Sequence, residues 1–143
     1  MSRAPRVLFG TGAVVSLLTG LAHLAGHLST PPPPGSASEA TMRSLMETLA
    51  FELPGATRTT IELYNGFSLV FSAFLLFVAL LDLVLLRRAR QDPGLLLPVA
   101  VVNAGGFAVL LGISLRYFFA IPTACLGTAF LCFALSAAAG RPR

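Results

Sequence analysis

The sequence predicts an all-α membrane protein: a four-transmembrane-helix bundle, N-in/C-in, with an amphipathic helix in the long outer first loop. The 143 residues are 55% hydrophobic and only 11% charged, and their mean hydropathy is +0.81. Soluble domains carry about 25% charged residues, so this composition points to lipid. Each of four apolar runs approaches the ~20 residues that a helix needs to cross a membrane. The chain is therefore expected to form a single membrane domain over residues 1–143, with spans at about 7–28, 64–86, 95–115 and 120–139.

The arginines predict the orientation of the four spans. All ten basic residues are arginines, and they lie near the ends of the apolar runs rather than in one stripe, which argues against a nucleic-acid partner. Cytoplasmic segments of membrane proteins carry an excess of arginine and lysine. With both termini cytoplasmic, seven arginines lie inside and three outside. The inside set is Arg3, Arg6, Arg87, Arg88, Arg90, Arg141 and Arg143, and the outside set is Arg43, Arg58 and Arg116.

The first loop, residues 29–63, is the one large segment outside the predicted spans. It opens with STPPPPGSAS, whose consecutive prolines form a stiff, non-helical spacer. A helix is expected at about 38–53, capped by Ser36 or Ser38 and ended by the stretch LPG. Its apolar residues recur at helical spacing, so it either lies in the lipid interface or covers the mouth of the bundle. These residues are Met42, Leu45, Met46, Leu49 and Leu53.

Small and polar side chains fall on one face of each of the first three spans. Such faces let membrane helices approach closely, because hydrophobicity supplies no drive for association within lipid. We therefore expect all three faces to point into the bundle. They consist of Gly12, Ser16, Gly20, His23 and His27, then Asn65, Ser68, Ser72 and Ala79, then Gly105, Ala108, Gly112 and Arg116.

Four further residues of the spans carry their own expectations. Asp82 lies near the inner end of the second span, and we expect it to pair with Arg87, Arg88 or water. Asn103, in the third span, is expected to form a hydrogen bond between helices. In the fourth span, Cys125 and Cys132 are too far apart along one helix for a disulfide, so we expect them to act as small packing residues.

Most other polar residues are predicted to meet at the outer mouth of the bundle, beneath the loop helix. The first and third spans run outward and the second runs inward, so three polar helix ends lie at one level. Arginine side chains there suit an anionic head group. The candidate ligand-binding residues are His23, His27, Arg58, Glu62, Tyr64, Asn65 and Arg116.

The pair His23 and His27 leaves three roles open. Histidines at positions i and i+4 can share a metal ion, with Glu62 as a third ligand. A histidine and a glutamate can also act as general acid and base. Alternatively, the histidines hydrogen-bond to Glu62, Asn65 or a backbone carbonyl and determine how the first two helices pack. The structural role is favoured, so we assign no metal ligand and no catalytic residue, and the sequence identifies no cofactor.

The stretches GLAHLAGHL and MRSLMETLAFELPGATRTTIELYNGFSL resemble a group of small uncharacterised bacterial four-helix integral membrane proteins, broadly DoxX-like. The shared pattern is a histidine pair ending the first helix, an M…F…G…RT segment, an acidic residue, an aromatic residue and GF opening the second helix. The chain departs from this pattern at two positions. It has Ile61 where tryptophan is common, and it has Glu62 where the pattern has aspartate. The matching residues are His23, His27, Met46, Phe51, Gly55, Arg58, Thr59, Glu62, Tyr64, Gly66 and Phe67.

The resemblance covers about half of the chain. It implies a four-helix fold and an outer cluster that acts as one unit, but no known reaction. DoxX-like proteins are linked with quinone or thiol redox partners. The expected location is the bacterial cytoplasmic (inner) membrane, with both termini cytoplasmic.

Three functions are compatible with these features. The favoured one is a non-enzymatic protein whose outer pocket binds a lipid-like, quinone-like or other small ligand, or docks a partner subunit. The second is a small membrane enzyme or redox accessory that uses His23, His27 and Glu62 as metal ligands or as an acid–base pair. The third is a structural subunit of a larger membrane complex. Expected partners are the lipid bilayer, a lipid or quinone ligand, and a second copy of the chain or a larger complex.

Overall fold

The computed structural model describes residues 3–140 of the chain and is built mostly of helices. Arg141 and Arg143, which contribute to the charge argument, lie outside the described residues. In chain order the elements are α1 (Arg3–Leu28), α2 (Ala37–Thr48), β1 (Ala50–Leu53), β2 (Ala56–Thr59), α3 (Thr60–Arg88), the 3₁₀ turn η1 (Pro93–Leu95), α4 (Leu96–Tyr117) and α5 (Ala120–Ala139).

Four helices are long and apolar enough to cross a membrane: α1, α3, α4 together with η1, and α5. Each of them contains one of the four apolar runs of the sequence. Their outward surfaces carry large apolar side chains, which a water-soluble protein rarely exposes in such continuity. This surface suits lipid and supports a multi-pass membrane protein. Examples of exposed side chains are Val7, Leu18, Phe74, Phe77, Val84, Val102, Val109 and Leu131.

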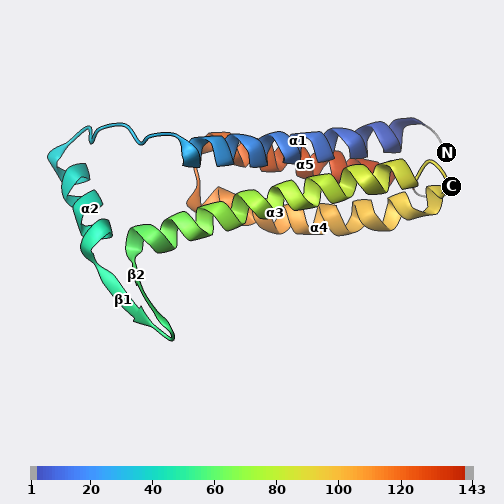
Figure 1. Cartoon of the computed structure of the whole chain (residues 1–143). Helices are drawn as coiled ribbons and strands as arrows, with labels where there is room; N and C mark the ends of the chain where they lie inside the picture. Colours follow the sequence, from blue (N-terminus) through green and yellow to red (C-terminus); the bar gives the residue numbers. More distant parts are fainter. Residues whose placement is uncertain (1–2, 141–143) are drawn as a thin grey trace.

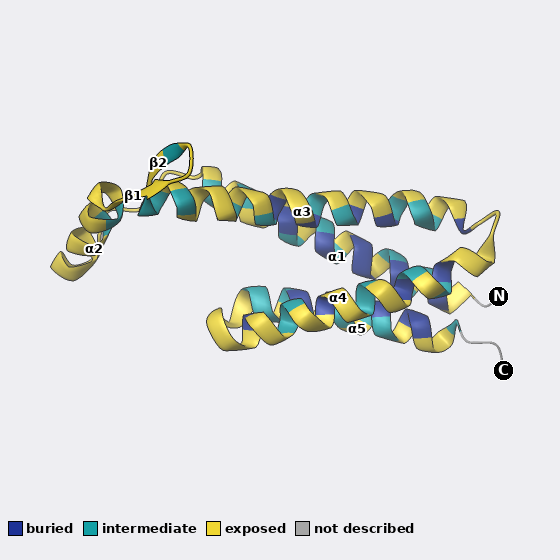
Figure 2. Ribbon diagram, turned by 90° about the horizontal axis from the view of Figure 1, so that it is seen from below, coloured by how far each residue is buried: buried dark blue, intermediate teal, exposed yellow. Residues whose placement is uncertain are grey.

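The four long helices pack in the order α3, α1, α5, α4. They lie side by side with the two ends of the chain at one end of the bundle and the first loop at the other (Figure 1). Buried residues follow the inner faces of the helices (Figure 2). Near the centre, the ring of Phe133 lies 5.2 Å from that of Phe9 and 5.3 Å from that of Phe107, measured between centroids. An aromatic side chain of α5 thus joins α1 to α4.

The small residues of the predicted faces of α1 and α3 point inward, whereas His23 and Asn65 of the same faces are exposed. Gly12, Ser16 and Gly20 are buried in α1, and Ser72 and Ala79 are buried in α3. These two helices make one of the most extensive contacts in the bundle. Such small side chains permit the two helix backbones to approach closely.

The expectation for the small residues of α4 is wrong. Gly105, Ala108 and Gly112 are exposed, whereas Phe107 is buried. The reason is that α4 turns Phe107 toward Phe133 of α5. The side of α4 that carries Gly105, Ala108 and Gly112 therefore points away from the core.

Helix α2 begins where one of the two predicted caps lies. The side-chain oxygen of Ser36 accepts a hydrogen bond from the backbone N–H of Glu39 at 3.2 Å, which satisfies one of the free donors at a helix start. The helix ends at Thr48 instead of continuing to about residue 53. Beyond the first loop's proline stretch, α2 contacts α3 and β2 and lies past the N-terminal end of α3 (Figure 1).

A β-hairpin takes the place of the last predicted helical residues. Strands β1 and β2 pair antiparallel, with Phe51 opposite Arg58 and Glu52 opposite Thr57. Pro54 and Gly55 lie at the turn, where Gly55 has a φ of +84°, a conformation that glycine adopts without steric cost. The stretch LPG therefore leads into a hairpin turn and does not end the helix.

Candidate functional site

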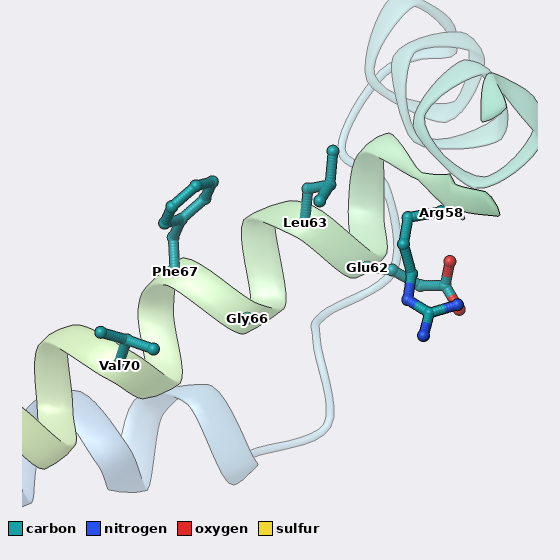
Figure 3. A pocket seen from close by; sticks show the side chains of 6 residues that line it. All are labelled: Arg58, Glu62, Leu63, Gly66, Phe67 and Val70. Atoms are coloured by element: carbon teal, nitrogen blue, oxygen red, sulfur yellow. The ribbon is translucent and has the colours of Figure 1, made fainter. Parts of the chain in front are cut away.

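A groove of about 330 Å³ lies along the N-terminal end of α3. Its lining combines one strand residue with one side of the helix, and both parts are visible in Figure 3. The lining residues are Arg58 from β2 and Glu62, Leu63, Gly66, Phe67 and Val70 from α3.

Most of the groove wall is apolar. Its apolar residues lie on one face of α3, because they follow Leu63 at helical spacing. Gly66, Phe67 and Val70 come three, four and seven residues after Leu63. Phe67 is 73% exposed. A Cβ atom at Gly66 would meet nothing within 4 Å, so the absence of a side chain there keeps the groove open.

The polar end of the groove is formed by Glu62 and Arg58. Glu62 closes a capping box with Thr59: the Thr59 N–H donates to Glu62 Oε2 at 2.7 Å, and the Glu62 N–H donates to Thr59 Oγ1 at 3.3 Å. This arrangement satisfies two free donors at the start of α3 and places a negative charge at its favourable end. Glu62 is therefore engaged with the backbone.

Arg58 is the cation of the groove. Its Nη1 donates to the carbonyl oxygen of Thr57 at 2.9 Å, which leaves most of the guanidinium donors for a ligand. Its side chain lies on the same side of the α3 start as Glu62 (Figure 3). An exposed guanidinium next to an apolar wall can bind a phosphate or carboxylate through paired hydrogen bonds.

His23 lies at the α1–α3 contact, and neither histidine lines the groove. His23 Nε2 is 3.1 Å from Ser68 Oγ, and the imidazole packs edge-on against Phe71 with 5.1 Å between ring centroids. His27 is half-buried one turn further along α1. Among residues 3–140, no three His, Cys, Asp or Glu side chains are placed to hold a metal ion together. The structure thus does not assemble Glu62 with the histidines as a ligand set.

The remaining predicted residues are distributed around the same end of the bundle. Tyr64 and Asn65 are exposed on α3 beside the groove but do not line it. Arg116 lies in the last turn of α4, a helix that packs on α5. Of the seven candidates, the groove therefore brings together only Arg58 and Glu62.

Four groove residues were missed by sequence reasoning: Leu63, Gly66, Phe67 and Val70. The signal that could have found them is their spacing along one helix face directly after Arg58 and Glu62. That spacing cannot be recognised from the sequence, because apolar residues occupy every face of this span. Only the position of Arg58 on the hairpin shows which face of α3 carries the groove.

At the opposite end of the bundle, Asp82 pairs with Asn103 and not with an arginine. Asn103 Nδ2 donates to Asp82 Oδ1 at 2.7 Å, which confirms the interhelical bond expected of Asn103. Asp82 is buried at 2% exposure, whereas Arg87 and Arg88 are exposed. The pairing with either arginine was predicted wrongly because their side chains point away from the core.

Comparison of the chain with protein-family models, with curated proteins and with solved structures found no match. The resemblance to DoxX-like proteins therefore stays a prediction.

Proposed function

We propose that the protein binds an amphiphile with an anionic head group, such as a lipid, in the groove at the outer end of α3, without catalysing a reaction. The observation that carries this proposal is the combination of Arg58 with an apolar wall in one groove. A guanidinium pairs with phosphate or carboxylate in a bidentate manner. The wall of Leu63, Phe67 and Val70 suits a hydrocarbon tail. The volume of about 330 Å³ is at the lower end of the ~300–1,000 Å³ of ligand pockets.

The proposal places the groove at the outer surface of a bacterial inner membrane, with both termini in the cytoplasm. Its support is the excess of arginines near the termini and the second connection, which is typical of cytoplasmic segments. The two ends of the chain lie at the bundle end opposite the groove (Figure 1). A head group bound at Arg58 would then lie in the outer leaflet.

We further propose that α2 and the hairpin lie in the lipid interface beside the groove. Apolar side chains of this unit are exposed, among them Met42 at 61% and Leu45 at 57%. In the hairpin, Phe51 and Arg58 are cross-strand partners and therefore share one face. An apolar side chain beside a cation fits the boundary between acyl chains and head groups.

The test is lipid binding by the purified protein and by Arg58→Gln. In mild detergent, native mass spectrometry should show retained phosphatidylglycerol, and phosphatidylcholine should be retained more weakly. Arg58→Gln should weaken phosphatidylglycerol binding about tenfold or more. The basis is that a hydrogen bond to a charged group contributes about 1.5–3 kcal/mol and about 1.4 kcal/mol corresponds to tenfold.

Two further variants sharpen this test. Arg43→Gln removes the same charge from α2, outside the groove, and should leave binding within about twofold, well below the tenfold that 1.4 kcal/mol represents. Gly66→Leu adds a side chain where space is open and should block the tail. Equal losses from Arg58→Gln and Arg43→Gln would show that only net charge matters and would refute the groove.

A further inference from the structure

The inner half of the bundle holds a carboxyl group that has no charged partner. Asp82 is 2% exposed and precedes Arg88, the last residue of α3, by about 9 Å at ~1.5 Å per residue. Its Oδ1 accepts the hydrogen bond from Asn103 Nδ2 at 2.7 Å. Its Oδ2 is buried and has no hydrogen-bond partner within residues 3–140. This site shares no residue with the groove at the other end of α3.

The charged groups of α1 and α3 near this end make no hydrogen bond with Asp82 within residues 3–140. Arg6 of α1 donates from Nη2 to the carbonyl oxygen of Ala89 at 3.0 Å, about two turns beyond Asp82, and its buried Nε has no hydrogen-bond partner among the described residues. Arg3, Arg87 and Arg88 are exposed. Neither helix thus supplies a cation to the Asp82 carboxyl group.

Helices α4 and α5 add no compensating charge. α4 contributes the neutral amide of Asn103, and its one charged residue, Arg116, is in the last turn at the opposite end. α5 contains no charged residue, and its titratable groups are the thiols of Cys125 and Cys132. Within residues 3–140, the amide of Asn103 is therefore the hydrogen-bond partner of the Asp82 carboxyl group, and no charged side chain of α4 or α5 joins it.

A bare carboxylate in such a place is unfavourable. An isolated charge removed from water costs so much free energy that the group neutralises instead, and ionisable side chains within membrane spans are rare for the same reason. Uptake of one proton from a hydronium ion forms an O–H bond on the carboxylate and releases one water. The side chain changes from a charge of minus one to a neutral acid.

We propose that Asp82 is a proton-binding site inside the bundle, holding one proton on Oδ2 while the amide of Asn103 binds Oδ1. The hydrogen-bond geometry selects the oxygen. Oδ1 already accepts a hydrogen from Asn103 and so acts as the carbonyl oxygen. Oδ2, which has no donor beside it, carries the hydrogen.

Infrared spectroscopy of the full chain at neutral pH, in an ester-free detergent such as dodecyl maltoside so that no lipid ester carbonyl overlaps the carboxyl band, tests this proposal. A protonated carboxyl group has a carbonyl stretch at higher frequency than the amide and carboxylate bands. The wild type should show this band, and Asp82→Asn, which is neutral and of the same shape, should lose it. Glu47→Gln on the exposed α2 is the matched control and should retain the band. A wild type without the band, or a band unaffected by Asp82→Asn, would overturn the proposal.

A second variant tests the geometry even if Asp82→Asn fails to fold. Asn103→Ala removes the donor to Oδ1, so the carbonyl stretch should shift to higher frequency, as expected for a carbonyl that loses a hydrogen bond. An unshifted band in Asn103→Ala would show that Oδ1 is not the carbonyl oxygen held by the amide.

Discussion

His23 makes a polar and an aromatic contact at the same time, with Ser68 and with Phe71 of α3. Both partners belong to the helix that packs most closely on α1. Among the roles considered for the histidines, this geometry favours packing of α1 on α3, although the partner is Ser68 and not Glu62 or Asn65. His27 makes no side-chain hydrogen bond within the described residues.

Replacing His23 should therefore affect stability in a way that depends on hydrogen bonding. His23→Leu should lower the free energy of unfolding by about 1.5–2.5 kcal/mol, because one hydrogen bond contributes about 1 kcal/mol and the edge-on ring contact about 0.5–1.5 kcal/mol. His23→Gln keeps a hydrogen-bonding group and should lose less. Reversible unfolding in mixed micelles, followed by circular dichroism, measures both. His27→Leu is the control, and an equal loss there would contradict the packing role.

The glycines of α1 provide a matched pair at residue scale. A Cβ at Gly20 would lie 3.1 Å from Leu75 Cβ, whereas a Cβ at Gly26 would meet nothing within 4 Å. Because Leu75 Cβ is attached directly to its backbone, it cannot rotate away, and the two helices must separate.

Gly20→Ala should accordingly destabilise the bundle by about 1–3 kcal/mol, the usual cost of overpacking. Gly26→Ala should be neutral or stabilising by about 0.5–1 kcal/mol, because alanine favours helix over glycine. The same unfolding measurement compares the two variants. Equal effects would mean that α1 and α3 are not in close contact at Gly20.

At the scale of elements, the first loop is organised by local sequence rules. Ser36 caps α2, Gly55 allows the hairpin turn, and the Thr59–Glu62 capping box starts α3 immediately after β2. The hairpin therefore leads without a linker into a membrane-spanning helix. This continuity limits how far the hairpin can move from the membrane surface.

A single tryptophan tests the proposed interfacial position, because the chain contains none. Phe51→Trp and Thr57→Trp occupy opposite faces of the hairpin, since Phe51 pairs with Arg58 and Thr57 with Glu52. In vesicles, the emission of Phe51→Trp should be blue-shifted and quenched by brominated lipid. Thr57→Trp should emit as an exposed indole and be quenched by iodide. Identical behaviour of the two would contradict an interfacial face on the hairpin.

At the scale of the whole molecule, contacts distant in sequence hold the ends of the helices together. Ser136 Oγ of α5 donates to the Pro5 carbonyl oxygen of α1 at 2.8 Å, and Arg6 donates to the Ala89 carbonyl oxygen beyond α3. These bonds join three of the long helices at the end that carries the chain termini. A homodimer or a larger complex stays a prediction.

The proposed orientation can be measured by cysteine labelling of intact cells. In a Cys125→Ala/Cys132→Ala background, Thr57→Cys in β2 should react with a membrane-impermeant maleimide. Gln91→Cys, in the turn between α3 and α4, should react only after the membrane is permeabilised. The reverse pattern would show that the chain inserts with its termini outside.

Much of the fold could be predicted because it depends on composition and local periodicity. The four long helices follow from apolar runs of sufficient length, and the Ser36 cap from a rule about helix starts. The hairpin was missed because Leu49 and Leu53 continue the helical spacing of α2, whereas the alternation of Leu49, Phe51 and Leu53, which is typical of a strand, is too short to decide between the two. For the site, Arg58 and Glu62 were identified as unusual polar residues, but their apolar neighbours were not.

The sequence by itself determined that the chain has four membrane-length helices and which residues share one end of the bundle, because hydrophobic length and chain direction are local properties. Only the tertiary structure decided which helix faces meet. The inner faces of α1 and α3 are lined by small residues, while α4 presents Phe107 instead of its glycines. Nearly uniform apolar spans carry little information about which side faces a neighbour. The pairing of Asp82 with Asn103 and the separation of the histidines from Arg58 therefore follow from packing.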